Sequence, residues 1–104
     1  MYRFTTPTHE FHLSLDVSRS SELLITYSQS GRIILEKHKS DLDISDDGKT
    51  VSFKMSQTES ALFNSENPVS LQVRVLTSSG DSFASPIKEV SIMPVLHNGV
   101  LGGE

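Results

Sequence analysis

Apolar and polar residues alternate with a period of two along most of the chain. The alternating segments cover residues 8–17, 22–29, 32–38, 50–56, 69–77 and 87–93. Such alternation is typical of β-strands that bury one face and expose the other. The residues expected on the buried faces are Phe11, Leu13, Leu15, Val17, Leu23, Ile25, Tyr27, Val51, Phe53, Met55, Val69, Leu71, Val73, Val75, Ile87, Val90 and Ile92. The pattern therefore predicts an all-β chain.

Turn sequences separate these segments and support the strand prediction. They are SQSGR at residues 28–32, SDDGK at residues 45–49 and SSGDS at residues 78–82. Each contains a glycine that can adopt the positive φ angle of a tight turn. A Ser-Pro pair at residues 85–86 interrupts the last alternating segment. The short spacing between turns is typical of a β-sandwich or a β-barrel.

One segment, residues 56–64, departs from the alternating pattern. Ser56 is followed three residues later by Glu59, which is the spacing of a helix capping box. We expect one short helical turn here, after which Leu62 and Phe63 turn inward. This turn would join two strands that lie in different sheets.

Together these elements resemble an immunoglobulin-like or fibronectin-like fold. We expect an all-β, immunoglobulin-like antiparallel β-sandwich of about seven strands with one short helical crossover. The chain has no cysteine pair and no tryptophan, so a partly open barrel is an alternative. The expected division is an N-terminal arm at residues 1–7, the sandwich domain at residues 8–94 and a C-terminal tail at residues 95–104.

Composition narrows the range of partners. The 104 residues include 9 basic and 13 acidic side chains, for a net charge of −4. An acidic chain is poorly suited to neutralising phosphates, and no basic amphipathic stripe is present, so we expect neither nucleic acid nor a membrane as partner. The chain has no cysteine, and its first residues lack the apolar segment of a signal peptide. We therefore expect folding in a cytoplasm.

Residues 41–55 contain the strongest candidate for a metal site. Asp43, Ser45 and Asp47 followed by Gly48 match the first half of a calcium-binding loop. Lys54 stands where such a loop needs a glutamate, and no helices are expected on either side. The sequence therefore favours a turn whose aspartates and glycine serve backbone geometry. A loose calcium site between subunits is the alternative, and we expect no cofactor.

Side chains that could support catalysis are not arranged in a recognisable pattern. His9 and His12 are three residues apart on an expected strand, so they point to opposite faces. His38 and His97 lie far away in sequence, and we expect all of them to be exposed rather than to bind zinc. The chain has no nucleophile elbow and no phosphate-binding glycine loop. We therefore expect a protein that is not an enzyme.

The two ends of the chain carry apolar residues outside the alternating segments. They are Tyr2 and Phe4 at the start and Val95, Leu96, Val100 and Leu101 at the end. One interpretation is that these segments fray. The other is that they form assembly contacts with a neighbouring subunit. Edge strands of the sandwich offer a further means of assembly.

Nearly the whole chain resembles small proteins encoded by phages and prophages of Firmicutes-type bacteria. The similarity is carried by YRFTTPTHEFHLSL, ITYSQSGRIILEK, VSFKMSQTESALF and VSLQVRVLTSSGDSFASPIKEVSI. It implies a virion structural or accessory protein of the tail, neck or decoration type, present in the host cytoplasm during assembly. The implied partners are other phage structural proteins, further copies of the chain, or both. A glycan-binding or host-surface-binding module is the alternative, although the chain has no tryptophan to stack on sugars.

Overall fold

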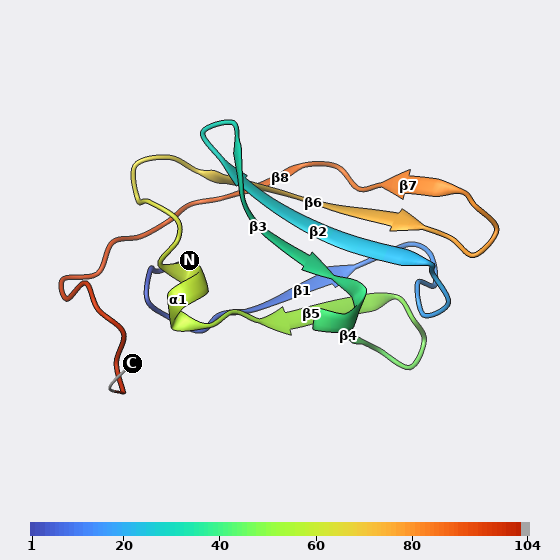
Figure 1. Cartoon of the computed structure of the whole chain (residues 1–104), viewed down its shortest axis with the longest axis horizontal. Helices are drawn as coiled ribbons and strands as arrows, with labels where there is room; N and C mark the ends of the chain where they lie inside the picture. Colours follow the sequence, from blue (N-terminus) through green and yellow to red (C-terminus); the bar gives the residue numbers. More distant parts are fainter. Residues whose placement is uncertain (103–104) are drawn as a thin grey trace.

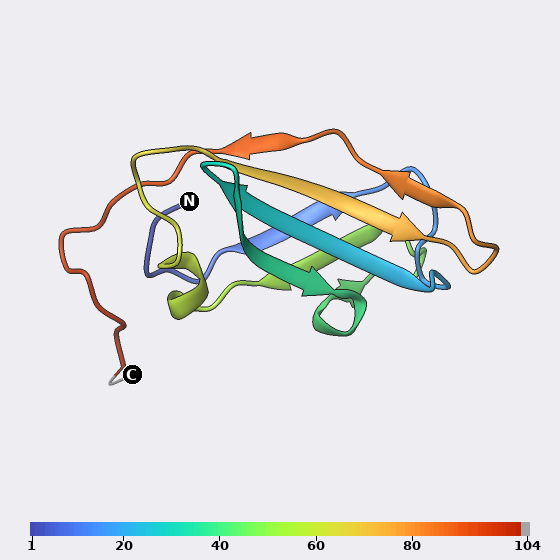
Figure 2. The same ribbon diagram turned by 45° about the horizontal axis from the view of Figure 1, so that its top comes forward.

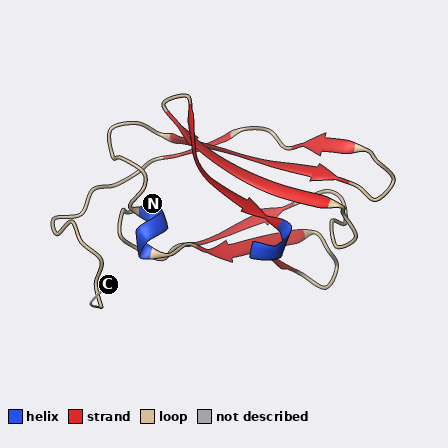
Figure 3. Ribbon diagram, in the orientation of Figure 1, coloured by secondary structure: helices blue, strands red, loops and turns tan. Residues whose placement is uncertain are grey.

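The computed structural model describes residues 1–102 and consists of two antiparallel β-sheets packed face to face (Figure 1, Figure 3). One sheet has three strands in the order β1-β5-β4, and the other has five, in the order β3-β2-β6-β7 with β8 also paired to β6. In chain order the strands are β1 (Thr8–His12), β2 (Glu22–Gln29), β3 (Arg32–His38), β4 (Asp43–Ile44), β5 (Thr50–Lys54), β6 (Val69–Leu76), β7 (Ser82–Ala84) and β8 (Lys88–Val90).

The strand order confirms the predicted immunoglobulin-like sandwich and excludes a barrel. In immunoglobulin domains strands B, E and D share one sheet, whereas C′, C, F and G share the other. Here β1, β5 and β4 take the places of B, E and D, and β3, β2, β6 and the β7–β8 pair take those of C′, C, F and G. In the described residues no strand occupies the place of strand A beside β1. The N-terminal segment instead forms a single parallel bridge between Tyr2 and Met93.

The core lies between the sheets and is built mainly from the predicted faces. Figure 2 shows the larger sheet in front of the smaller one. Phe63 and Ile92, which lie outside the strands, complete this layer. The buried apolar residues are Val17, Leu23, Ile25, Tyr27, Val51, Phe53, Met55, Phe63, Val69, Leu71, Val73, Val75 and Ile92.

The turn between β2 and β3 has the backbone geometry that its sequence predicts. Gln29 pairs with Arg32, leaving a two-residue loop. Ser30 and Gly31 have φ angles of 54° and 77°. Two consecutive positive φ angles are the requirement of a type I′ turn, whose twist matches that of the strands it joins.

The crossover from β5 to β6 contains the predicted capping box. Helix α1 (Gln57–Ser60) follows Ser56, whose hydroxyl accepts a hydrogen bond from the Glu59 amide at 3.1 Å. The Glu59 carboxylate accepts one from the Ser56 amide at 2.9 Å. Phe63 turns inward as expected, but Leu62 is 52% exposed, so its predicted burial is wrong. Neighbouring residues beyond the helix point in different directions, and only Phe63 faces the core.

Two further expectations differ from the structure. The first strand ends at His12 rather than at residue 17, because the chain leaves the sheet and Val17 donates its amide to the Gly48 carbonyl at 2.8 Å. Ile87 is 65% exposed, because it lies in the interruption between β7 and β8.

A one-turn 3-10 helix, η1 (Lys39–Asp41), connects β3 to β4. Within residues 1–102 no helix is long and apolar enough to cross a membrane.

Candidate functional site

Strand β1 forms an edge of the smaller sheet, and half of its backbone groups point away from that sheet. The Met55 amide donates to the Pro7 carbonyl, and the Leu13 amide donates to the Lys49 carbonyl. Hydrogen-bonded pairs alternate along an antiparallel ladder, so the odd-numbered residues of β1 bond to β5. The residues whose backbone N–H and C=O groups point outward are therefore Thr8, Glu10 and His12.

A groove runs beside this edge, between β1 and the β6–β8 part of the larger sheet. It consists of a cavity of about 280 Å³ bordered by Phe11 and Leu71 and one of about 310 Å³ bordered by Leu13 and Phe83. A smaller cavity, bordered by Phe11, Leu13, Leu71 and Val73, connects the two. Phe11 and Leu13 are half-buried, although they pack against the core. The groove is apolar, and it lies where strand A would cover the sandwich.

Charged side chains of both signs stand at the rim of the groove. Glu10 and His12 lie on the exposed face of β1 with 4.0 Å between carboxylate oxygen and imidazole nitrogen. Lys88 and Glu89 border the groove from β8. An unpaired strand edge beside an apolar groove is the arrangement that accepts an additional β-strand from another polypeptide.

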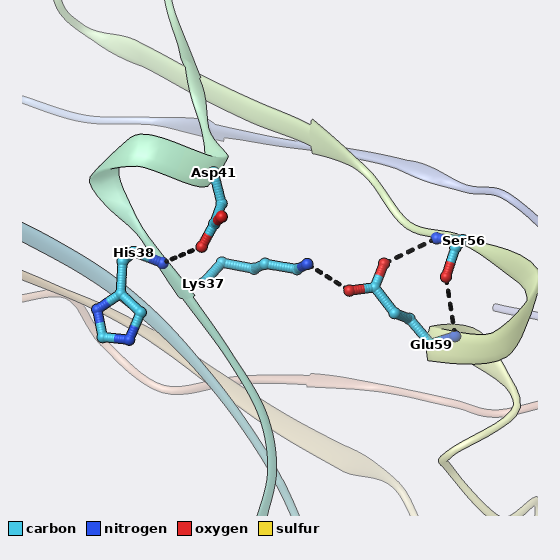
Figure 4. A network of polar contacts seen from close by, with 5 residues as sticks. All are labelled: Lys37, His38, Asp41, Ser56 and Glu59. Atoms are coloured by element: carbon cyan, nitrogen blue, oxygen red, sulfur yellow. Dashed lines mark hydrogen bonds and ion pairs between the residues drawn. The ribbon is translucent and has the colours of Figure 1, made fainter.

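On the side of the sandwich opposite the β1 edge, polar side chains connect β3 to the crossover (Figure 4). Lys37 of β3 forms an ion pair with Glu59 of α1, and both side chains are largely buried. Burial alone would raise the pKa of Glu59, but hydrogen bonds from Lys37 and Ser56 hold that pKa below its usual value. The Lys37 ammonium also lies 5.7 Å from the centre of the Phe53 ring. This network ties β3 to the crossover.

His9 is not an exposed strand histidine, so that prediction is wrong. Its Nδ1 atom lies 2.6 Å from the Tyr27 hydroxyl oxygen, and the two rings stack with centres 5.7 Å apart. Phe53 meets the His9 ring edge-on at 5.8 Å. Burial lowers the pKa of His9 and raises the pKa of Tyr27. The cluster joins the sheets, and its partners come from strands that the sequence alone does not place opposite one another.

The segment with the weak calcium candidates Asp43, Ser45 and Asp47 forms a turn between β4 and β5, which is the interpretation that the sequence favours. The Ser45 hydroxyl and the Lys49 amide both donate to one carboxylate oxygen of Asp47, at 2.6 and 3.0 Å. These hydrogen bonds hold the pKa of Asp47 below its usual value. Asp43 is exposed on β4. Among residues 1–102 no group of three His, Cys, Asp or Glu residues is arranged to hold a metal ion.

The N-terminal arm is bonded to the sandwich through Arg3. Its guanidinium donates to the carbonyl oxygens of Phe63 and Ala61, at 2.7 and 3.0 Å. The backbone of Met1 and Arg3 pairs with Met93 on both sides. The arm therefore covers the end of the crossover (Figure 1).

The apolar residues of the two ends differ in their exposure. Tyr2 is 55% exposed and Leu101 is 67% exposed, whereas Leu96 is fully exposed. Phe4 lies under the Arg3 guanidinium, with 5.1 Å to the ring centre, and Val95 and Val100 are partly covered. The tail is attached to α1 by two hydrogen bonds between the Gln57 side chain and the Leu101 backbone. The structure does not bring these six residues into one patch with the β1 edge.

Comparisons with known proteins give likenesses to solved structures and no match by sequence. No family model matches the chain, and no curated protein matches it. A solved structure described as the V domain of amphioxus IgVJ-C2 is 10% identical, with a TM-score of 0.36 over 88% of this chain and 95% of that chain. The order of the strands in the two sheets identifies the fold.

Proposed function

We propose that the protein is a non-enzymatic structural or accessory protein of a phage virion, and that it acts through contacts with other proteins. The observation that carries this proposal is the free edge of β1. Its outward N–H and C=O groups lie beside an apolar groove, and an added strand would satisfy the former and cover the latter. The expected partners are other phage structural proteins, further copies of the chain, or both.

The assignment to a virion is supported by the resemblance of the whole chain to small phage-encoded proteins. A tail, neck or decoration protein is assembled in the host cytoplasm, and it acts through repeated contacts between subunits. The exposed side chains of Tyr2, Leu96 and Leu101, near the two ends of the chain, offer additional contact area. Phe4, Val95 and Val100 lie beside them in the chain and belong to the same proposed contacts.

A glycan-binding role has weaker support. Sugar recognition commonly uses exposed aromatic rings that form a stacking surface. The most exposed aromatic side chains are Tyr2 and Phe83. Phe83 lies opposite Val75 at one end of β6, whereas Tyr2 pairs with Met93, beyond the other end. They therefore do not form one platform.

A proline at the edge of β1 tests the proposal. Glu10→Pro removes one outward N–H group at a position where the ladder to β5 does not need it, so the fold should persist. Glu10→Ala is the matched control, because it removes the same carboxylate and keeps the N–H. We expect the control to enter phage particles from an induced source bacterium, as detected by mass spectrometry, and the proline variant to be excluded. Equal incorporation of a folded Glu10→Pro variant, or the absence of the wild-type chain from particles, would contradict the proposal.

A further inference from the structure

We propose that the strand added to β1 is β1 of a second copy, antiparallel to the first, with the two Phe11 residues facing each other on a two-fold axis. This inference rests on the proposed role of the β1 edge in assembly and specifies the partner and the register. The two smaller sheets would join into one continuous sheet, β4-β5-β1-β1-β5-β4.

The free edge of β1 differs from the other strand edges in the described part of the chain. Natural sheets protect their edges with very short strands, lysines, prolines or bulges. Strand β4 has two residues, and β7 and β8 have three each. Strand β3 carries Arg32 and Lys37, and its pairing with β2 is irregular at Tyr27/Ser28. Strand β1 has five residues and contains no lysine, no proline and no bulge.

The chemistry of the outward residues favours one register. Antiparallel pairing of β1 with itself must place outward-facing residues opposite one another. Centring the pair on Glu10 would juxtapose two carboxylates, which is destabilising, and centring it on His12 would juxtapose two imidazoles. Centring it on Phe11 places Glu10 of each copy opposite His12 of the other. That register sets a carboxylate against an imidazole twice.

The same register suits the side chains that face the groove. Phe11 bonds to β5 through its backbone, so across the axis it would form a non-hydrogen-bonded pair, in which side chains approach most closely. Two aromatic rings in such a pair stabilise an antiparallel sheet. Each residue contacts its counterpart reciprocally, as a two-fold interface requires. A second copy therefore matches this edge in hydrogen bonding, charge and apolar contact.

Position-specific cross-linking tests this arrangement. The chain has no cysteine, so Phe11→Cys introduces a single thiol. In a non-hydrogen-bonded pair the Cα atoms are about 4.5 Å apart, within the range of a disulfide. Thr8→Cys is the matched control on the same edge, because Thr8 would face Ser14 and lie far from its own counterpart. At about 1 µM protein the Phe11→Cys chains should cross-link about a thousandfold faster than Thr8→Cys, since docked thiols have an effective concentration in the millimolar range.

A second pair of variants covers the case in which Phe11→Cys does not fold. Glu10→Cys and His12→Cys alter exposed side chains, and mixing the two proteins should yield the mixed disulfide in excess over either homodimer. Equal cross-linking at positions 8 and 11, or no excess of the mixed disulfide, would overturn the proposed register and partner. If that result accompanies exclusion of Glu10→Pro from particles, the β1 edge binds a different protein and the proposed function stands. If Glu10→Pro enters particles normally, the proposed function fails as well.

Discussion

His9 of β1 and Tyr27 of β2 share a hydrogen bond of 2.6 Å that joins the two sheets of the sandwich. The contact lies near the free edge of β1, where Thr8, His9 and Glu10 border the groove. The imidazole is therefore only partly shielded from water, yet it packs against two aromatic rings. This arrangement makes the stability of the fold sensitive to the protonation of His9.

We predict that the free energy of unfolding falls as the pH is lowered through about 6.5. Burial lowers the pKa of His9 in the folded chain from its ordinary value of 6.5. The unfolded chain consequently takes up a proton first, and stability is fully present only above that pH. Urea unfolding between pH 5 and 7 should show this slope in the wild type and a smaller slope in His9→Gln. His12→Gln is the control, and an unchanged slope in His9→Gln would refute the prediction.

Loss of the Glu59 carboxylate should lower the free energy of unfolding more than loss of the helix cap alone. Glu59→Ala removes both the ion pair with Lys37 and the hydrogen bond from the Ser56 amide, and we expect it to cost about 1.5–3 kcal/mol. Ser56→Ala removes the Ser56 Oγ–Glu59 amide bond, at a cost of about 1 kcal/mol. Urea denaturation of both variants measures the difference. Equal losses would mean that Lys37 contributes little.

Gly48 should tolerate substitution less well than Gly31, although both have φ angles above 70°. Alanine with such a φ angle costs about 1–2 kcal/mol at either position. At Gly48 the new methyl group would also overlap the Asp16 carboxylate, which is held by the amide and hydroxyl of Ser18, whereas Gly31 faces open space. Thermal unfolding should therefore show a larger loss for Gly48→Ala. A loss no greater than that of Gly31→Ala would show that Asp16 moves aside freely.

The period-two pattern predicted β2, β5 and β6 well because each of these strands buries one face and exposes the other. It also holds for Leu13 and Leu15, which pack against the core as predicted although the strand itself ends at His12. Prediction failed where the face of the sheet no longer decides burial. The pattern placed Ile87 on a buried face, and the expected helical turn placed Leu62 inward. Both lie in connections, where burial depends on how the chain turns and not on a repeat.

The candidate site was harder to predict than the fold for a physical reason. Any sandwich has edges, but which edge remains free depends on strand order, and alternation carries no information on order. The sequence also does not reveal that Arg3 fastens the first residues to the crossover carbonyls of Phe63 and Ala61. Those bonds direct the arm toward Met93 and leave the edge of β1 uncovered.

The arm and the tail should differ in their importance for stability. Arg3→Ala leaves two part-buried carbonyl oxygens without their charged donor, and we expect a loss of about 2–4 kcal/mol. Removal of residues 96–104 takes away exposed leucines and a few exposed hydrogen bonds, and we expect a loss below about 1 kcal/mol. Calorimetry of the two variants shows which of them loses more stability. A larger loss from the truncation would contradict this division of roles.

Amide hydrogen exchange along β1, followed as the protein is diluted, shows whether the β1 edge pairs with a second copy. We predict that the outward amides of Thr8, Glu10 and His12 are protected at high concentration and lose protection on dilution, whereas the amides of His9 and Phe11 stay protected throughout. Light scattering on the same samples should show a matching change from dimer to monomer. Fast exchange of the Glu10 amide at every concentration, in a sample that is dimeric throughout, would show that the β1 edge is not the contact.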